Sequence, residues 1–292
     1  MKRSFQPLLI ALTVLIGALA QARAQAQAVE TGIVKLGDAN IEYFSQGRGE
    51  AVVLLPGGSF DVGYLEPLAA TLAGVGYRVV RINPRGAGKS TGPLVEAVTY
   101  HTFASDVAGV IHTLHLEPAN VVGHAFGNRI ARTLATDHPE LVRSVVLLAA
   151  GGKVAPDPKA QQALAVIFNP TASEAEIMEA MKFMVGNPAN SEQVWQAIKP
   201  SRAPNAAAAQ AASTPATPEN EWWAPPGKVP YLVVQGMQDK VASPENGRLL
   251  KQDLGERVTT VELPDAGHMM LVEYPEKVAS ALVSFLHRIG TR

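Results

Sequence analysis

The sequence predicts an α/β fold with a mostly parallel sheet of about eight strands and helices on both faces. Continuous apolar runs such as Ala51–Leu55 are typical of strands buried on both faces. Such runs alternate along the chain with stretches of helical periodicity, which indicates parallel strands joined by crossover helices. The 292 residues are 47% hydrophobic, enough for one large domain with an inserted subdomain.

The predicted sheet begins with a hairpin. Residues 31–36 and 41–46 alternate in hydropathy and are joined by Gly37-Asp38, which is typical of a tight antiparallel turn. After the strand at 51–55, helices and strands follow in alternation: helix 65–75, strand 78–82, helix 101–116, strand 120–123, a helix around 130–135 and strand 142–149.

The pattern changes between residues 152 and 228, where no clear strand is present. Three helical stretches lie near 161–168, 175–185 and 192–198, and an Ala- and Pro-rich segment at 201–218 fits either a loop or a short alanine helix. The sheet resumes with strand 231–235, helix 244–254, strand 259–263 and helix 275–289. We therefore expect a core of residues 30–151 and 229–292 and an inserted helical lid at 152–228.

A Gly-x-Ala-x-Gly turn joins strand 120–123 to the next helix, with Ala125 at its tip. This is the frame of the nucleophile elbow, Gly-x-Ser-x-Gly, in which a sharp turn lifts one side chain over the sheet edge. Glycines at 123 and 127 fit a strained turn because side chains there would clash with it. Ala125 has no hydroxyl, thiol or carboxylate, so it offers no group that can attack.

With this turn and the motifs around it, the chain resembles the α/β-hydrolase family over nearly all residues after the first 30 or so. The family's order is nucleophile, acid, histidine. The resemblance places Ala125 at the nucleophile position. It implies that Asp239, after the strand 231–235, is the acid and that His268, before the last helix, is the base.

Two further motifs carry the resemblance. Pro56-Gly57-Gly58-Ser59 matches the loop that supplies one oxyanion-hole amide, from Gly58 or Ser59, and the Phe126 N–H would be the other. Asn83 to Ser90 matches the family's Asp-x-Arg-Gly-x-Gly-x-Ser turn, with Asn in place of Asp.

The resemblance implies a hydrolase acting on a small, mostly apolar ester, lactone or related acyl compound, without metal or organic cofactor. Ala125 leaves three interpretations open. The chain is a serine hydrolase that lacks its serine, or an enzyme whose His–Asp pair works without a covalent step, as in lyases or cofactor-free oxygenases. Alternatively, it is an inactive relative that binds a ligand.

Other residues near these motifs have more ordinary interpretations. His124 is expected to pack beneath the elbow, and Arg85 to organise loops. Trp222 and Trp223 could line a pocket under the lid or anchor the lid to the core. Apolar residues of the lid region are expected to line a pocket above Ala125: Phe168, Met178, Met181, Phe183 or Trp222.

The charge balance gives no sign of a nucleic-acid or acidic membrane partner, since 25 basic and 26 acidic residues leave a net charge of −1. The absence of cysteine excludes disulfides, thiolate metal sites and a cysteine nucleophile. We expect a small-molecule substrate and a monomer or homodimer.

The first residues resemble an export signal. Lys2 and Arg3 precede an apolar run from Leu8 to Ala20, which is short for a membrane span, and alternating alanines follow up to Ala28. We predict removal of residues 1–28, or a few fewer, and a periplasmic or secreted protein with no membrane attachment after cleavage. Mass spectrometry of the protein from its native host tests this, and an intact Met1 on membrane-bound material would contradict it.

Overall fold

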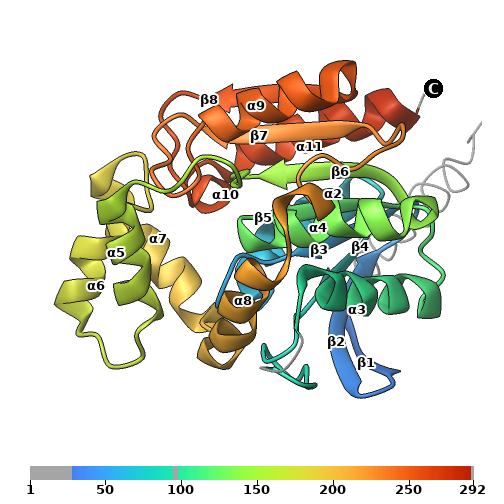
Figure 1. Cartoon of the computed structure of the whole chain (residues 1–292), viewed down its shortest axis with the longest axis horizontal. Helices are drawn as coiled ribbons and strands as arrows, with labels where there is room; N and C mark the ends of the chain where they lie inside the picture. The colour runs from blue at the N-terminus through green and yellow to red at the C-terminus, as the bar shows by residue number, and fades with distance from the viewer. Residues whose placement is uncertain (1–27, 95–97, 291–292) are drawn as a thin grey trace, which may run out of the picture.

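The computed structural model describes residues 28–94 and 98–290, so nearly all of the predicted signal segment lies outside the described residues (Figure 1). Eight strands form one sheet in the order β1-β2-β4-β3-β5-β6-β7-β8. They are β1 (Glu30–Leu36), β2 (Ala39–Gly47), β3 (Ala51–Leu55), β4 (Arg78–Ile82), β5 (Ala119–His124), β6 (Val142–Leu148), β7 (Tyr231–Gly236) and β8 (Val258–Leu263).

The predicted hairpin is present at one edge of the sheet. β1 and β2 run antiparallel, and Leu36 pairs with Ala39 across the turn Gly37-Asp38. β2 is also antiparallel to β4, whereas every pairing from β4 to β8 is parallel. The mostly parallel sheet that the sequence predicts is therefore confirmed.

Helices cover both faces of the sheet, as predicted. On one face, α2 (Glu66–Gly74) and α11 (Pro275–Gly290) pack with alternate strand residues such as Val52 and Val122. On the other face, α3 (Tyr100–Thr113), α4 (Phe126–Asp137) and α9 (Glu245–Leu254) pack against the residues between them, such as Val53 and Val121. Burial of both faces explains the continuous apolar runs of the central strands.

The segment between β6 and β7 is helical and contains no named strand. It holds α5 (Pro158–Phe168), α6 (Glu174–Met181), α7 (Ser191–Ile198) and α8 (Pro204–Ala216). α5, α6 and α7 form a block beside the sheet, whereas α8 lies closer to it, near α4 (Figure 1). The Ala- and Pro-rich stretch is thus a helix, with Pro204 at its first turn where a missing N–H costs little.

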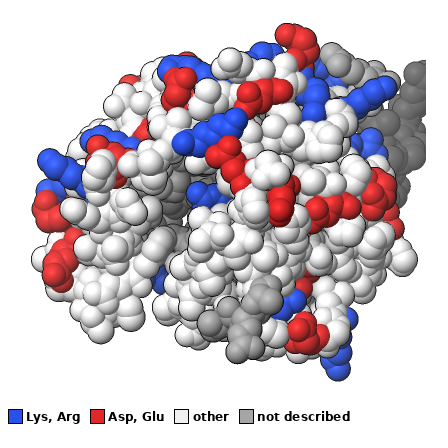
Figure 2. Space-filling model, in the orientation of Figure 1, with Lys and Arg blue, Asp and Glu red and all other residues white. Residues whose placement is uncertain are grey.

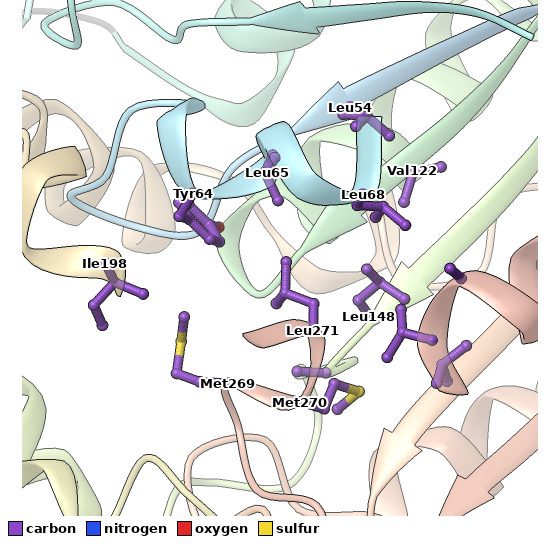
Figure 3. Close-up of a cluster of buried hydrophobic side chains, with 14 of the residues drawn as sticks. Leu54, Tyr64, Leu65, Leu68, Val122, Leu148, Ile198, Met269, Met270 and Leu271 are labelled. Atoms are coloured by element: carbon purple, nitrogen blue, oxygen red, sulfur yellow. The ribbon is translucent and has the colours of Figure 1, made fainter. Parts of the chain in front are cut away.

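A buried apolar cluster next to His268 connects the sheet domain to the helical segment between β6 and β7. Met269, Met270 and Leu271 of the loop and α10 (Met270–Glu273) meet side chains from β3, β5, β6, α2 and the α7 residue Ile198 (Figure 3). The residues that follow His268 are therefore fixed by packing. In the part of the chain that the structure describes, no helix is long and apolar enough to span a bilayer.

Candidate active site

The turn between β5 and α4 has the strained geometry that the Gly-x-Ala-x-Gly pattern predicts. Ala125 has φ 48° and ψ −106°, a conformation that side chains rarely adopt. A Cβ on Gly123 would lie 2.3 Å from the Gly127 carbonyl, and a Cβ on Gly127 would lie 2.6 Å from the Leu55 carbonyl oxygen. The predicted reason for the two glycines is confirmed: the elbow packs too tightly for side chains on either side.

Asp239 and His268, far apart in the sequence, meet at the same end of the sheet. The His268 Nδ1 lies 3.0 Å from Asp239 Oδ2, and both side chains are buried. Asp239 Oδ1 accepts the backbone N–H groups of Val241 and Ala242, each at 2.8 Å. The carboxylate can only accept here, so Nδ1 carries the His268 proton. The fixed carboxylate therefore orients the ring and selects its tautomer.

The second nitrogen of His268, Nε2, is left with a lone pair. Among the described residues it has no hydrogen-bond partner. Ala125 and His268 both line two neighbouring cavities, one of about 30 Å³ and one of about 340 Å³. His268 and Ala125, the residue at the tip of the elbow, thus line the same space.

The predicted oxyanion loop lies beside the start of α4. A Cβ on Gly58 would lie 3.6 Å from the Phe126 Cβ, and in the described part of the chain the N–H groups of Gly58 and Phe126 have no acceptor. The Ser59 N–H already donates to Gln210 Oε1 of α8 at 2.6 Å. In this structure the available pair of amides is therefore Gly58 and Phe126.

His124 links the oxyanion loop to the His268 loop, which is more specific than the packing role expected for it. Its Nε2 lies 3.1 Å from the His268 carbonyl oxygen, and its Nδ1 lies 2.8 Å from the Tyr64 hydroxyl. The carbonyl can only accept, so Nε2 is the protonated nitrogen and Tyr64 donates to Nδ1. The Gly57 N–H in turn donates to Tyr64 at 2.7 Å.

This chain of hydrogen bonds requires a neutral His124. Burial, and after it the nearby His268, lowers its pKa from 6.5 to about 3, while the bond to the His268 carbonyl opposes this shift. The unfolded chain binds the proton more readily. The stability that His124 contributes is therefore complete above about pH 6.5 and is lost as the pH falls toward about 3.

We predict that acidification destabilises the protein through His124. Between about pH 7.5 and 5.5 the free energy of unfolding should fall by about 1.4 kcal/mol more in the wild type than in His124→Gln. Urea denaturation at several pH values measures this. The comparison uses the slope of the free energy of unfolding against pH, so a loss of stability that is the same at every pH does not affect it. Equal slopes for the two proteins would contradict the proposed burial of a neutral His124.

A single carboxylate ties the helical segment to the His268 loop. Glu273 accepts the backbone N–H groups of Gly186 and Gly267, at 2.9 Å in its shorter contacts, and the Asn190 side chain at 3.2 Å. Gly186 and Asn190 belong to the segment between α6 and α7, and Gly267 precedes His268. The position of the histidine therefore depends on the helical segment as well as on the sheet.

The 340 Å³ cavity is walled by the sheet domain and by α5 and α8. Figure 2 shows the surface hollowed between the helical block and the rest of the molecule. Phe168 lines both cavities, as predicted, but four other predicted residues line neither: Met178, Met181, Phe183 and Trp222. Met181 is in the core, and Trp222 packs on Tyr100 at 5.4 Å between ring centroids, which anchors the segment.

The Asn83–Ser90 turn has a structural role, as expected of Arg85. Arg85 forms a buried ion pair with Asp106 of α3, with a shortest N–O distance of 2.6 Å. Asn83 takes the family's Asp position and accepts the Val62 N–H at 2.9 Å while donating to Glu42 at 2.9 Å. An amide can do both, whereas an aspartate could not donate to Glu42.

Sequence reasoning missed three polar side chains of the cavity, Arg129 of α4 and Gln210 and Thr214 of α8. Gln210 lies in a segment whose composition fitted a loop equally well. Arg129 stands four residues after Ala125, the spacing of one helical turn, which was a usable signal. Within the described residues no group of three or more His, Cys, Asp or Glu side chains could hold a metal ion.

Comparisons with known proteins agree with the fold. A family profile with the description "alpha/beta hydrolase fold" matches residues 50–275, a range that includes Ala125, Asp239 and His268. The chain therefore belongs to the α/β-hydrolase fold family, a class of hydrolase-type proteins.

Among curated proteins, BpoC of Mycobacterium tuberculosis, provisionally named a non-heme bromoperoxidase, is 30% identical over 266 residues, which cover 84% of this chain and 97% of BpoC. Epoxide hydrolase B of the same organism is 43% identical over 76 residues, 26% of this chain and 21% of that protein. Among solved structures, an esterase from Thermogutta terrifontis superposes with a TM-score of 0.74 at 22% identity, over 89% of this chain and 99% of the esterase.

Proposed function

We propose that the protein hydrolyses a small, mostly apolar ester, lactone or related acyl compound with water as the direct nucleophile. The observation that carries this proposal is the His268–Asp239 pair: His268 lines the same cavity as Ala125, and its Nε2 is unpartnered among the described residues. A methyl group cannot form an acyl-enzyme, so the base itself would act on water.

The proposed reaction balances with the groups of the site. His268 Nε2 takes a proton from water as the water oxygen bonds to the acyl carbon. The carbonyl electron pair moves to oxygen, where the Gly58 and Phe126 N–H groups stabilise the charge. When the tetrahedral species collapses, the bond to the leaving oxygen breaks, and this oxygen takes the proton from His268. Asp239 holds the ring and stabilises its charged form.

Several features support this proposal beyond family membership. The base and the residues of the two unpaired amides line one cavity, whose other lining residues are mostly apolar. We further propose that residues 152–228 act as the lid of this site, since α5 and α8 form part of its wall. The apolar run after Lys2 and Arg3 supports export to the periplasm or the medium.

A second candidate function rests on the same Ala125. Without a nucleophile, the pair could instead abstract a proton from a carbon acid, as a lyase or cofactor-free oxygenase would. The unpaired amides would stabilise an enolate as readily as a tetrahedral oxyanion. Product analysis separates the two, because hydrolysis in ¹⁸O-labelled water places the label in the released acid.

The test of a non-covalent mechanism is His268→Ala in the chain as it stands. We expect kcat to fall about 10²- to 10⁴-fold with KM little changed, because the base acts only in the transition state. Initial rates on a panel of p-nitrophenyl esters and lactones measure this. His112→Gln, at an exposed position of α3, is the matched control and should behave as the wild type. Undiminished turnover in His268→Ala would refute the base assignment.

A further inference from the structure

We propose that the substrate carries a carboxylate, which binds the Arg129 guanidinium while the acyl group lies against His268. This inference rests on the proposed function for the identity of the reacting group. It concerns the same cavity. The mostly apolar substrate of the proposed function would carry a single anionic group at one end.

Arg129 is the cationic side chain that lines the 340 Å³ cavity, and no Asp or Glu residue lines it. Its guanidinium reaches the cavity wall at Gly151, where a Cβ would lie 4.0 Å from Arg129 Nη2. In the described part of the chain the guanidinium has no hydrogen-bond acceptor, and its buried Nε is unpaired. An unpaired cationic donor at a cavity is costly unless a ligand completes it.

Other arginines of the protein contrast with Arg129. Arg85 has Asp106 as a partner, and Arg248 has Glu245. Arg132, one turn further along α4 and fully buried, donates to Asn128 and to the Gly151 carbonyl oxygen, both at 2.7 Å. The Arg129 Nε is buried, so the N–H groups of its two Nη atoms are the donors that remain available to a ligand.

Aromatic rings hold the Arg129 guanidinium in place without consuming its donors. Its Cζ lies 5.7 Å from the Trp222 ring centroid and 6.0 Å from that of Tyr100. Arg132 stacks on the same Trp222 at 4.5 Å. Burial, and after it the nearby Arg129, lowers the pKa of Arg132 to about 9. Two neighbouring cations favour an anion at the less buried one, Arg129, although Glu219 partly offsets the charge at Arg132.

The shape of the guanidinium and the position of Arg129 relative to Ala125 indicate which kind of anion binds and how far it lies from the reacting carbon. A planar guanidinium with two parallel N–H groups matches a carboxylate, and the mostly apolar walls suit a single charge better than a phosphate dianion. Arg129 follows Ala125, the N-cap residue of α4, by four residues, an interval of roughly 6 Å along the helix axis. A carboxylate separated from the acyl carbon by a few carbon atoms spans that interval, as in monoesters of short dicarboxylic acids.

Ligand binding tests this inference without requiring turnover. Calorimetric titration of the purified protein with 4-phenylbutanoate and with its neutral analogue 4-phenylbutanamide compares the carboxylate with the amide. We expect the carboxylate to bind about 10- to 100-fold more tightly, as a charge-assisted bidentate pair implies. Arg129→Met should lower the affinity for 4-phenylbutanoate to that for the amide. Arg129→Lys should retain part of the preference for the carboxylate over the amide.

Two controls support the reading of the titrations. Binding of the amide should be equal in all variants, which shows that the cavity remains folded, and Arg248→Met on α9 should leave both ligands unaffected. Equal binding of the two ligands, absence of binding by both, a preference that survives Arg129→Met, or tighter binding of inorganic phosphate would each overturn the proposal.

Turnover then separates this inference from the proposed function. p-Nitrophenyl hemisuccinate and p-nitrophenyl levulinate differ mainly in charge. Hydrolysis of both with no preference that depends on Arg129 would support the hydrolase and refute the carboxylate site. Arg129-dependent binding of 4-phenylbutanoate with no turnover of any ester would support the site and refute the hydrolase.

Discussion

Ala125→Ser is expected to raise the turnover of activated esters by roughly 10³-fold or more, because it adds an attacking oxygen beside the proposed base and oxyanion amides. The hydroxyl would project from the strained elbow toward the space that His268 Nε2 faces. The oxyanion amides of Gly58 and Phe126 are already unpaired. Stopped-flow kinetics with p-nitrophenyl butyrate should then show a burst, and a fluorophosphonate should label residue 125.

Two controls show whether a gain in rate comes from the new hydroxyl or from a relaxed backbone at the turn. Ala125→Gly relieves the positive φ without adding a hydroxyl, so it should show neither a burst nor a gain in rate. Ala125→Ser combined with His268→Ala should lose most of the gain. If the serine variant is no faster than the parent, the cavity is not arranged for acyl transfer and the carbon-acid function becomes the better explanation.

Asp239→Asn is expected to reduce turnover about 10³- to 10⁴-fold while the protein stays folded. The asparagine carbonyl can still accept hydrogen bonds from the Val241 and Ala242 N–H groups, so the conformation of the loop after β7 is preserved. Its amide nitrogen would face His268 Nδ1, which must then accept, so the ring proton moves to Nε2. A protonated Nε2 cannot take a proton from water.

The effect should appear in kcat rather than in KM, because the tautomer matters in the transition state. Thermal denaturation of Asp239→Asn close to that of the wild type would show that the loop is intact. Activity that survives in this variant but not in His268→Ala would mean that another group orients the histidine.

Much of the fold and part of the candidate site could be predicted because their signals are local. The Gly37-Asp38 hairpin, the buried strands and the elbow glycines depend on residues within a few positions of one another. Asp239 and His268 could be paired from a family resemblance, since each follows a strand in a fixed order, and the structure places them 3.0 Å apart.

The remainder depended on contacts that no short stretch encodes. The Ser59–Gln210 bond joins residues 151 positions apart, and the Tyr64–His124 bond joins residues 60 apart. An unpaired arginine is also invisible in sequence, because only the folded structure shows that no carboxylate reaches Arg129. The lining of the cavity was mostly mispredicted for the same reason: apolar composition does not distinguish a cavity wall from the core.

The bonds that Glu273 makes have a consequence for how fast a substrate is exchanged. Because this carboxylate joins the helical segment to the His268 loop, a wide hinge motion of the residues between α6 and α7 would carry His268 away from Asp239. On the α8 side, Ser59 accepts the Ala203 N–H through its backbone carbonyl at 2.8 Å, which holds the other end. Side-chain rotation between α5 and α8 would then admit a substrate, and such rotation takes picoseconds to nanoseconds rather than the microseconds to milliseconds of a hinge motion. Product release is therefore expected to be faster than proton transfer, and added viscosity should leave kcat unchanged.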